Sequence, residues 1–443
     1  MRRSDIYLKR LERVMKWYAP ARFGVFYHWG LFTGGGCSIH GNEESQGSPL
    51  AFKTAAEFDA ATPAPEVVAR NMIDGAVRAG ARYAILTALH SGEAECVLFP
   101  TRSRSYLYKT QKDYIGAFLD EAHRRGLKAE LYFPMGPGDW DAPEAGPSLA
   151  EDARDMPGWA AAFRALLAEM KERYGDRIDG FWLDGRMEGD ERRALPAYIR
   201  SLWPEAIITS NGDGELNIDE LDIGTSEEYE DTPSPSYNRP SAYRRNGRWG
   251  ATPPRRDFNE DIPHVGADLY WWWAGDGTTN KAYIDDRFLL LRQMCCAIGQ
   301  RGIWNFAPGL TPLIDGSLPD NHLPWLDAIR GFLDWGSEAV FGTKGAEASI
   351  MTPGYFDHHN SIGFASITRP FDRDDIFYAL VTQAPLKGFA LFESAGYVPT
   401  RITDLRTGEV LPFEMWGSGP YLEGVDWSDV ERFGVKVLKF EFD

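Results

Sequence analysis

The sequence is poor in cysteine and lacks the cysteine spacing of zinc sites. It has four cysteines, Cys37, Cys96, Cys295 and Cys296, and no CxxC pair. Cys295 and Cys296 are neighbours, and adjacent cysteines rarely bridge each other, because disulfide geometry needs a wider separation. The sequence therefore predicts free thiols in a reducing compartment.

Positive charge and long apolar runs are also scarce. The chain has 47 Lys and Arg against 65 Asp and Glu, a net charge of −18, which argues against nucleic acid or an anionic membrane as a partner. No stretch is apolar enough for a transmembrane helix, and residues 1–20 are charged throughout, without the apolar segment of a signal peptide. We expect a cytoplasmic protein without membrane or nucleic-acid partners. Whether it forms a homo-oligomer is left open by the sequence.

Aromatic residues are abundant instead. They make up 13% of the 443 residues, and 15 of them are Trp. Aromatic-rich clefts commonly hold sugar rings, although a large core with wide loops explains the same composition. The length allows two or three domains, or one large α/β domain with a smaller module.

Short apolar runs alternate with helical patterns along most of the chain. Continuous apolar character is typical of parallel strands that are buried on both faces. The predicted strands are 23–30, 82–90, 127–134, 178–185, 206–212, 221–229, 268–275 and 302–309. The clearest predicted helices between them are 65–80, 112–126 and 157–175. Eight such units predict an α/β fold, a (β/α)8 TIM-like barrel.

Two segments depart from this pattern. Residues 230–265 are rich in Pro, Arg and aromatics, which indicates a long functional loop or a disordered excursion. After residue 345, β-rich runs separated by Gly, Pro and Asp predict a small antiparallel β-sandwich. The predicted domains are a barrel over 1–345 and a sandwich over 346–443, which we expect to cap the barrel.

Polar and aromatic residues gather at the carboxyl ends of the predicted strands, where a TIM barrel carries its active site. They are His28, Trp29, His90, Asp184, Asn211, Glu227, Trp272 and Asn305. Paired carboxylates with histidines and Trp are typical of a glycosidase, which needs a nucleophile, an acid/base and groups that hold the sugar. No HxH or HExxH spacing supports a metal, so we expect neither metal nor cofactor.

Simpler interpretations compete with these assignments. An Asp before a Gly, such as Asp184, also suits a turn. His28 and His90 also suit a buried core. The assignment of Glu227 as a site residue competes most strongly with such an interpretation, because Glu228 or Glu230, which are close by, could be the acid/base instead.

Six segments, taken in order, resemble the α-L-fucosidases of glycoside hydrolase family 29. They are "ARFGVFYHWGLFT", "AGARYAILTALH", "GLKAELYF", "YGDRIDGFWLDG", "GIWNFAPGLTPLIDGSL" and "FLDWGSEAVFGT". The resemblance covers about 20–345 and implies a barrel that hydrolyses a glycoside. Matched residue by residue, it implies Asp184 as nucleophile, His28 and His90 as sugar ligands, and Glu227 as acid/base.

The chain departs from the family pattern at sugar-binding positions. In "LHSGEAE", Ser91 stands where the family has a second His, and Gly92 where it has an Asp. The family's Arg after the fifth strand has no counterpart. The sequence thus predicts a retaining exo-glycosidase for α-L-fucosides or a similarly shaped sugar. The alternatives are a glycosidase of the same fold for another sugar, and a carbohydrate-binding homologue without turnover, against which the retained Asp184 argues.

Overall fold

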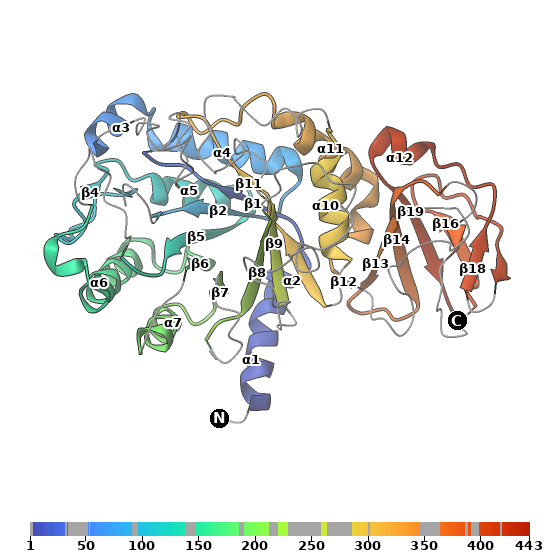
Figure 1. The fold of residues 1–443 in the computed structure, drawn as a ribbon, viewed down its shortest axis with the longest axis horizontal. Coiled ribbons are helices and arrows are strands. Elements are labelled where there is room, and N and C mark those ends of the chain that lie inside the picture. The colour runs from blue at the N-terminus through green and yellow to red at the C-terminus, as the bar shows by residue number, and fades with distance from the viewer. Residues whose placement is uncertain are drawn as a thin grey trace, which may run out of the picture.

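The chain folds into one curled parallel sheet with helices around it and two antiparallel sheets after it (Figure 1). The structure is a computed structural model. It describes residues 3–31, 33, 52, 54–90, 96–137, 148–185, 190–211, 220–228, 258–263, 286–299, 302–345, 364–385, 389–390, 398–416 and 419–443. In this part of the chain, no helix is both long and apolar enough to cross a bilayer.

The parallel sheet closes on itself. Its order is β10-β9-β8-β7-β6-β5-β2-β1-β11. The bounds are β1 Gly24–Tyr27, β2 Tyr83–Thr87, β5 Lys128–Pro134, β6 Gly180–Asp184, β7 Ile207–Ser210, β8 Ile223–Glu228, β9 Phe258–Pro263, β10 Ile303–Phe306 and β11 Gly309–Leu310. Phe23 bridges to Phe306, and the N–H of His28 donates to the carbonyl of Leu310 at 3.0 Å, so the last strands run along the first. The predicted TIM-like barrel is confirmed.

Helices surround the barrel, and the predicted ones form within two residues of their expected ends. The helices of the barrel part are α1 Arg3–Lys16, α2 Tyr18–Ala21, α3 Ala55–Ala61, α4 Pro65–Ala79, α5 Tyr114–Arg124, α6 Met156–Tyr174, α7 Glu191–Leu202, α10 Leu289–Ile298 and α11 Leu323–Gly336. Short elements complete it: β3 Cys96–Val97, β4 Tyr108–Lys109, η1 Glu151–Ala153 and η2 Ser337–Ala339. Asp113 and Asp155 begin α5 and α6 by accepting N–H bonds from Gly116 and Gly158, both at 2.8 Å.

Large rings fill the barrel interior. Phe26, Tyr83, Tyr132 and Trp182 point inward from four neighbouring strands and belong to one buried cluster. A glycine makes room for one of them, because a Cβ at Gly24 would lie 2.4 Å from the ring of Tyr83. The interior is therefore a packed core, and only its carboxyl end is left for a site.

The N-terminal segment covers the other end of the barrel. α1 and α2 lie there (Figure 1), and Val14, Tyr18 and Ala19 join the interior cluster. The side-chain amide of Asn305 donates to the carbonyl of Tyr18 at 2.8 Å, which ties this segment to β10.

The seventh strand differs from its prediction. We predicted it at 268–275, but the strand between β8 and β10 is β9, at the end of the segment predicted as a long loop. Its sequence, FNEDIP, has three consecutive polar residues, Asn259, Glu260 and Asp261, so it does not show the continuous apolar run of a strand buried on both faces. Residues 229–257 and 264–285 lie outside the described residues.

The C-terminal part is antiparallel, as predicted. One sheet contains β12 Thr343–Gly345, β13 Phe364–Pro370, β14 Ile376–Gln383, β16 Arg401–Asp404 and β19 Lys436–Glu441. The other contains β15 Phe389–Ala390, β17 Glu414–Trp416 and β18 Gly419–Leu422, and α12 spans Ser428–Phe433. Leu422 of the smaller sheet packs with Phe377, Ile402 and Phe440 of the larger one. The domain boundary at residue 345 stays a prediction.

Candidate active site

Asp184 is the last residue of β6 and is held at both carboxylate oxygens. Its Oδ2 accepts a hydrogen bond from the Tyr132 hydroxyl at 2.5 Å, and its Oδ1 accepts one from the Asn211 side-chain amide at 2.9 Å. The Thr225 hydroxyl donates to Asn211 Oδ1 at 2.8 Å, which fixes the orientation of that amide. Asp184 is half-buried, and Gly185 turns the chain away with φ 88°. Strands β5, β6, β7 and β8 thus fix one carboxylate at the barrel's carboxyl end.

The two predicted histidines, His28 and His90, lie beside Tyr132, which binds the Asp184 carboxylate. The His90 ring stacks on Tyr132 with centroids 5.0 Å apart and 12° between planes. The His28 ring lies 5.8 Å from that of His90 and 6.2 Å from that of Tyr132. Both histidines are at least nine-tenths buried. The structure therefore brings His28, His90, Asp184 and Asn211 together around Tyr132.

An aromatic layer lies directly beneath. Trp182, two residues before Asp184 on β6, stacks on Tyr132 with centroids 5.3 Å apart, and Phe26 lies 5.2 Å from Trp182. The site therefore has a closely packed aromatic floor.

Two glutamates are fully buried below this layer. Glu260 of β9 accepts hydrogen bonds from the Tyr83 hydroxyl at 2.5 Å and from Trp182 Nε1 at 3.0 Å. Glu130 of β5 lies over Gly180, where a Cβ would come within 2.7 Å of its carboxyl carbon. Burial, and then the charges of Glu260 and Asp179, raise the pKa of Glu130 well above its usual range.

Two predicted site residues lie elsewhere. Trp29 packs against Phe58 and Tyr114, at 4.8 and 5.0 Å, and its Nε1 donates to the Leu313 carbonyl at 3.1 Å. It follows the inward-facing His28 and so points to the helix side of the sheet. Asn305 is fully buried and binds the carbonyl of Tyr18, at the barrel's other end.

The remaining predicted residues are described in part or not at all. Glu227 lies on β8, opposite Ile262 of β9, but the described structure stops at its backbone. Trp272, Glu230 and Ser91 lie outside the described residues.

Sequence reasoning missed Tyr132 and Thr225. Each lies within a strand rather than at its carboxyl end, where the strand pattern predicts the site. A signal for Tyr132 was present, because the strand "KAELYFP" carries Glu130 and Tyr132 two residues apart and hence on one face.

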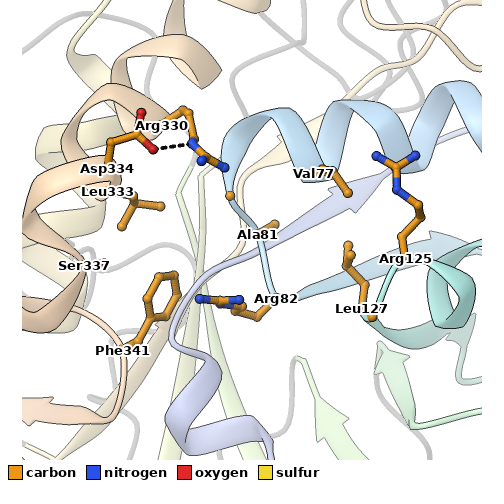
Figure 2. A pocket seen from close by; sticks show the side chains of 12 residues that line it. Val77, Ala81, Arg82, Arg125, Leu127, Arg330, Leu333, Asp334, Ser337 and Phe341 are labelled. Carbon is orange, nitrogen blue, oxygen red and sulfur yellow. Dashed lines mark hydrogen bonds and ion pairs between the residues drawn. The ribbon is translucent and has the colours of Figure 1, made fainter.

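A separate pocket lies at the opposite end of the barrel. It has a volume of about 260 Å³ and is lined by Arg82, Leu127 and Phe341 among others (Figure 2). Arg82 and Leu127 directly precede β2 and β5, so the pocket is at the amino ends of the strands, away from Asp184. The Arg82 guanidinium lies 4.4 Å from the Phe341 ring centroid.

A TIM barrel that holds one carboxylate, two histidines and an aromatic floor at its carboxyl end has the architecture of a barrel glycoside hydrolase. The family model of α-L-fucosidases matches residues 6–244, more than half of the chain. The protein therefore belongs to the α-L-fucosidase family, glycoside hydrolase family 29.

Solved structures agree on the fold over nearly the whole chain. α-L-Fucosidase isoenzyme 1 from Paenibacillus thiaminolyticus is 17% identical with TM-score 0.68, covering 98% of this chain and 100% of that one. The Thermotoga maritima α-fucosidase is 16% identical with TM-score 0.68, covering 98% and 99%. A covalent intermediate of the Bacteroides thetaiotaomicron enzyme, trapped with 2-fluoro-fucosyl fluoride, is 16% identical with TM-score 0.67, covering 97% and 96%. Comparison with curated proteins gives no match.

Proposed function

We propose that the protein is a retaining exo-glycosidase that hydrolyses α-L-fucosides or a similarly shaped sugar. The observation that carries the proposal is the carboxylate of Asp184, bound at both oxygens by Tyr132 and Asn211. Both donors interact best with an ionised carboxylate and fix its direction, which a nucleophile requires. Family membership makes glycoside hydrolysis the reaction class that this geometry fits.

In the first step, Asp184 attacks the anomeric carbon while an acid protonates the leaving oxygen. The glycosidic C–O bond breaks and an ester forms between the sugar and Asp184. In the second step, the same acid, now a base, takes a proton from water, which attacks the anomeric carbon and releases Asp184. His28 and His90 hold sugar hydroxyls above the aromatic floor.

We assign the acid/base to Glu227. The hydrogen bonds from Thr225 through Asn211 to Asp184 link β8 with β6, so β8 borders the nucleophile. Position 227 follows Thr225 by two residues and shares its face of the strand. A retaining mechanism requires the carboxyl groups of Asp184 and Glu227 about 5–5.5 Å apart.

Two relatives support a fucose-shaped substrate. The Thermotoga maritima enzyme has been solved in complex with fucose, at 17% identity and TM-score 0.64, covering 96% of each chain. The Bacteroides thetaiotaomicron enzyme forms a covalent intermediate with a fluorinated fucosyl fluoride, as retention demands. The changed "LHSGEAE" segment after β2 favours a second candidate, the same chemistry on another sugar.

Hydrolysis of a panel of aryl glycosides tests the proposal. We expect turnover of the α-L-fucoside, with retention at the anomeric carbon by proton NMR of the first product. Cleavage of another glycoside alone would support the second candidate. Absence of turnover on every member, with sugar binding retained in calorimetry, would instead indicate a carbohydrate-binding homologue.

Tyr132→Phe is expected to lower kcat/KM about 10- to 100-fold. The change removes one hydrogen bond to a charged group, worth about 1.5–3 kcal/mol, and each ~1.4 kcal/mol is a factor of ten. Steady-state kinetics measure the effect. Tyr174→Phe is the matched control, since the Tyr174 hydroxyl donates to Asp113 at 2.7 Å beside α5, away from Asp184. Equal kinetic effects in the two variants would contradict the assignment.

Glu227→Gln is expected to slow substrates according to their leaving groups. An alkyl or sugar leaving group needs protonation, so we expect its cleavage to fall about 10²- to 10⁴-fold. A dinitrophenolate needs little protonation, so its first step should slow far less. Glu228→Gln is the control, because position 228 is adjacent on β8 and belongs to the other face of the strand by alternation. A leaving-group dependence in Glu228→Gln alone would move the acid to Glu228.

A further inference from the structure

The buried Glu260 is connected to Asp184 through two aromatic rings. Glu260 is fully buried inside the barrel, and both of its carboxylate oxygens accept hydrogen bonds. One of the donors is the indole N–H of Trp182, at 3.0 Å. Trp182 is also fully buried, so its indole N–H cannot reach water. The Glu260 carboxylate supplies the acceptor that a buried donor requires.

The indole that Glu260 holds supports the ring of Tyr132. Trp182 and Tyr132 are stacked, with centroids 5.3 Å apart and 25° between planes. His90 also stacks on Tyr132, at 5.0 Å. The Tyr132 ring therefore lies stacked between Trp182 and His90, with the rings of Phe26 and His28 beside it.

The Tyr132 ring in turn sets the position of the carboxylate. Its hydroxyl donates to Asp184 Oδ2 at 2.5 Å, so a displacement of the ring moves or breaks this hydrogen bond. Near-attack geometry tolerates little displacement of a nucleophile. We propose that Glu260 is a positioning residue for Asp184, acting through Trp182 and Tyr132. The proposal rests on the proposed role of Asp184 as nucleophile.

Glu130 provides a matched control within the same interior. It is as buried as Glu260 and lies two residues before the inward-pointing Tyr132 on β5, hence on the same face of the strand. Among the described residues, however, neither of its carboxylate oxygens receives a hydrogen bond. Removing the Glu130 carboxyl therefore takes a buried carboxyl group out of the same interior without releasing Trp182.

The test compares Glu260→Met, Glu260→Gln and Glu130→Met. Met fills the space of Glu without an acceptor for the indole. Gln keeps an acceptor for Trp182, and its amide nitrogen can donate to the Tyr83 hydroxyl oxygen. We expect Glu260→Met to lower kcat about 10- to 100-fold with little change in KM, and Gln and Glu130→Met to stay within about threefold of wild type. Active sites are counted by covalent labelling with 2-fluoro-fucosyl fluoride, so that unfolded protein does not enter kcat.

A double-mutant cycle tests the route of the effect. If Glu260 acts through Tyr132, Glu260→Met should cost far less in a Tyr132→Phe background than in wild type. Additive losses would overturn the proposal. So would a Glu130→Met loss equal to that of Glu260→Met. Glu260→Asp, which withdraws the carboxylate from the indole by one methylene, should lower kcat in the same direction and replaces Glu260→Met if that variant fails to fold.

Crystal structures separate this proposal from the proposed function. In Glu260→Met, the Tyr132 hydroxyl should move away from Asp184, while in Glu130→Met it should stay. An unmoved Tyr132 in Glu260→Met would overturn the positioning role even if the enzyme is an active fucosidase. A wild type without turnover on any glycoside would contradict the proposed function and, with it, a positioning role in catalysis.

Discussion

Asp184→Ala is expected to lower kcat for an aryl α-L-fucoside by about 10⁴-fold or more, the scale of loss when a catalytic group that works as part of a unit is removed. The variant lacks the atom that bonds to the anomeric carbon, so neither step of a retaining reaction can proceed. Azide should restore part of the turnover, because a small anion fits the space that the carboxylate leaves. Attack by azide forms a β-fucosyl azide, which NMR identifies.

The exposed Asp176 provides the control for this experiment. Its carboxylate pairs with Lys171 on the surface, and Asp176→Ala should leave kcat unchanged. Asp184→Asn is the isosteric companion, with the same expected loss and a smaller response to azide. Residual activity of Asp184→Ala near the wild-type level would remove Asp184 from the mechanism.

Glu130→Gln is expected to stabilise the protein relative to wild type, increasingly so as the pH rises. Burial raises the pKa of Glu130 in the folded state above its unfolded value of about 4.3, so folding takes up a proton there. The stability linked to this group is fully present below pH ~4.3 and is lost as the pH rises toward the folded pKa, at about 1.4 kcal/mol per pH unit. Glutamine does not ionise, so its advantage over wild type should grow as the pH rises from 5 to 7.

Urea unfolding at several pH values measures this difference. The difference in unfolding free energy between Glu130→Gln and wild type should climb from pH 5 to pH 7. Glu423→Gln serves as the control, because Glu423 is exposed on the C-terminal part. Its difference from wild type should not vary in the same way. Parallel curves for Glu130→Gln and wild type would show that Glu130 does not take up a proton on folding.

Seven of the eight barrel strands could be predicted from the sequence, and the reason the other could not is physical. Strands buried on both faces appear as apolar runs, as in "GFWLD" and "YAILT". The strand β9 instead carries Glu260 on its inner face. Hydrogen bonds from Tyr83 and Trp182 offset the free-energy cost of burying its carboxylate. Those partners lie on β2 and β6, far away in the sequence, so the sequence around Glu260 does not predict them.

The candidate site could be predicted in outline, from the residues at strand ends. Asp184, Asn211, His28 and His90 gather as the parallel topology requires. Strand ends alone do not tell which side of the sheet a residue faces, nor how deep in the barrel it lies. Trp29 was misplaced for the first reason and Asn305 for the second.

The first and last segments of the barrel part are joined to each other. The side-chain amide of Asn305 donates to the carbonyl of Tyr18, the N–H of Phe306 donates to the carbonyl of Arg22, and Phe23 bridges to Phe306. These contacts join residues nearly 290 positions apart, so they cannot form until almost the whole barrel has been synthesised. Until β10 leaves the ribosome, the N-terminal segment cannot pack against it. Tyr18 and Val14, which are buried in the folded protein, are therefore exposed during translation. Closure of the barrel is thus a long-range event that comes late in synthesis, after most of the loop-closure entropy has been lost.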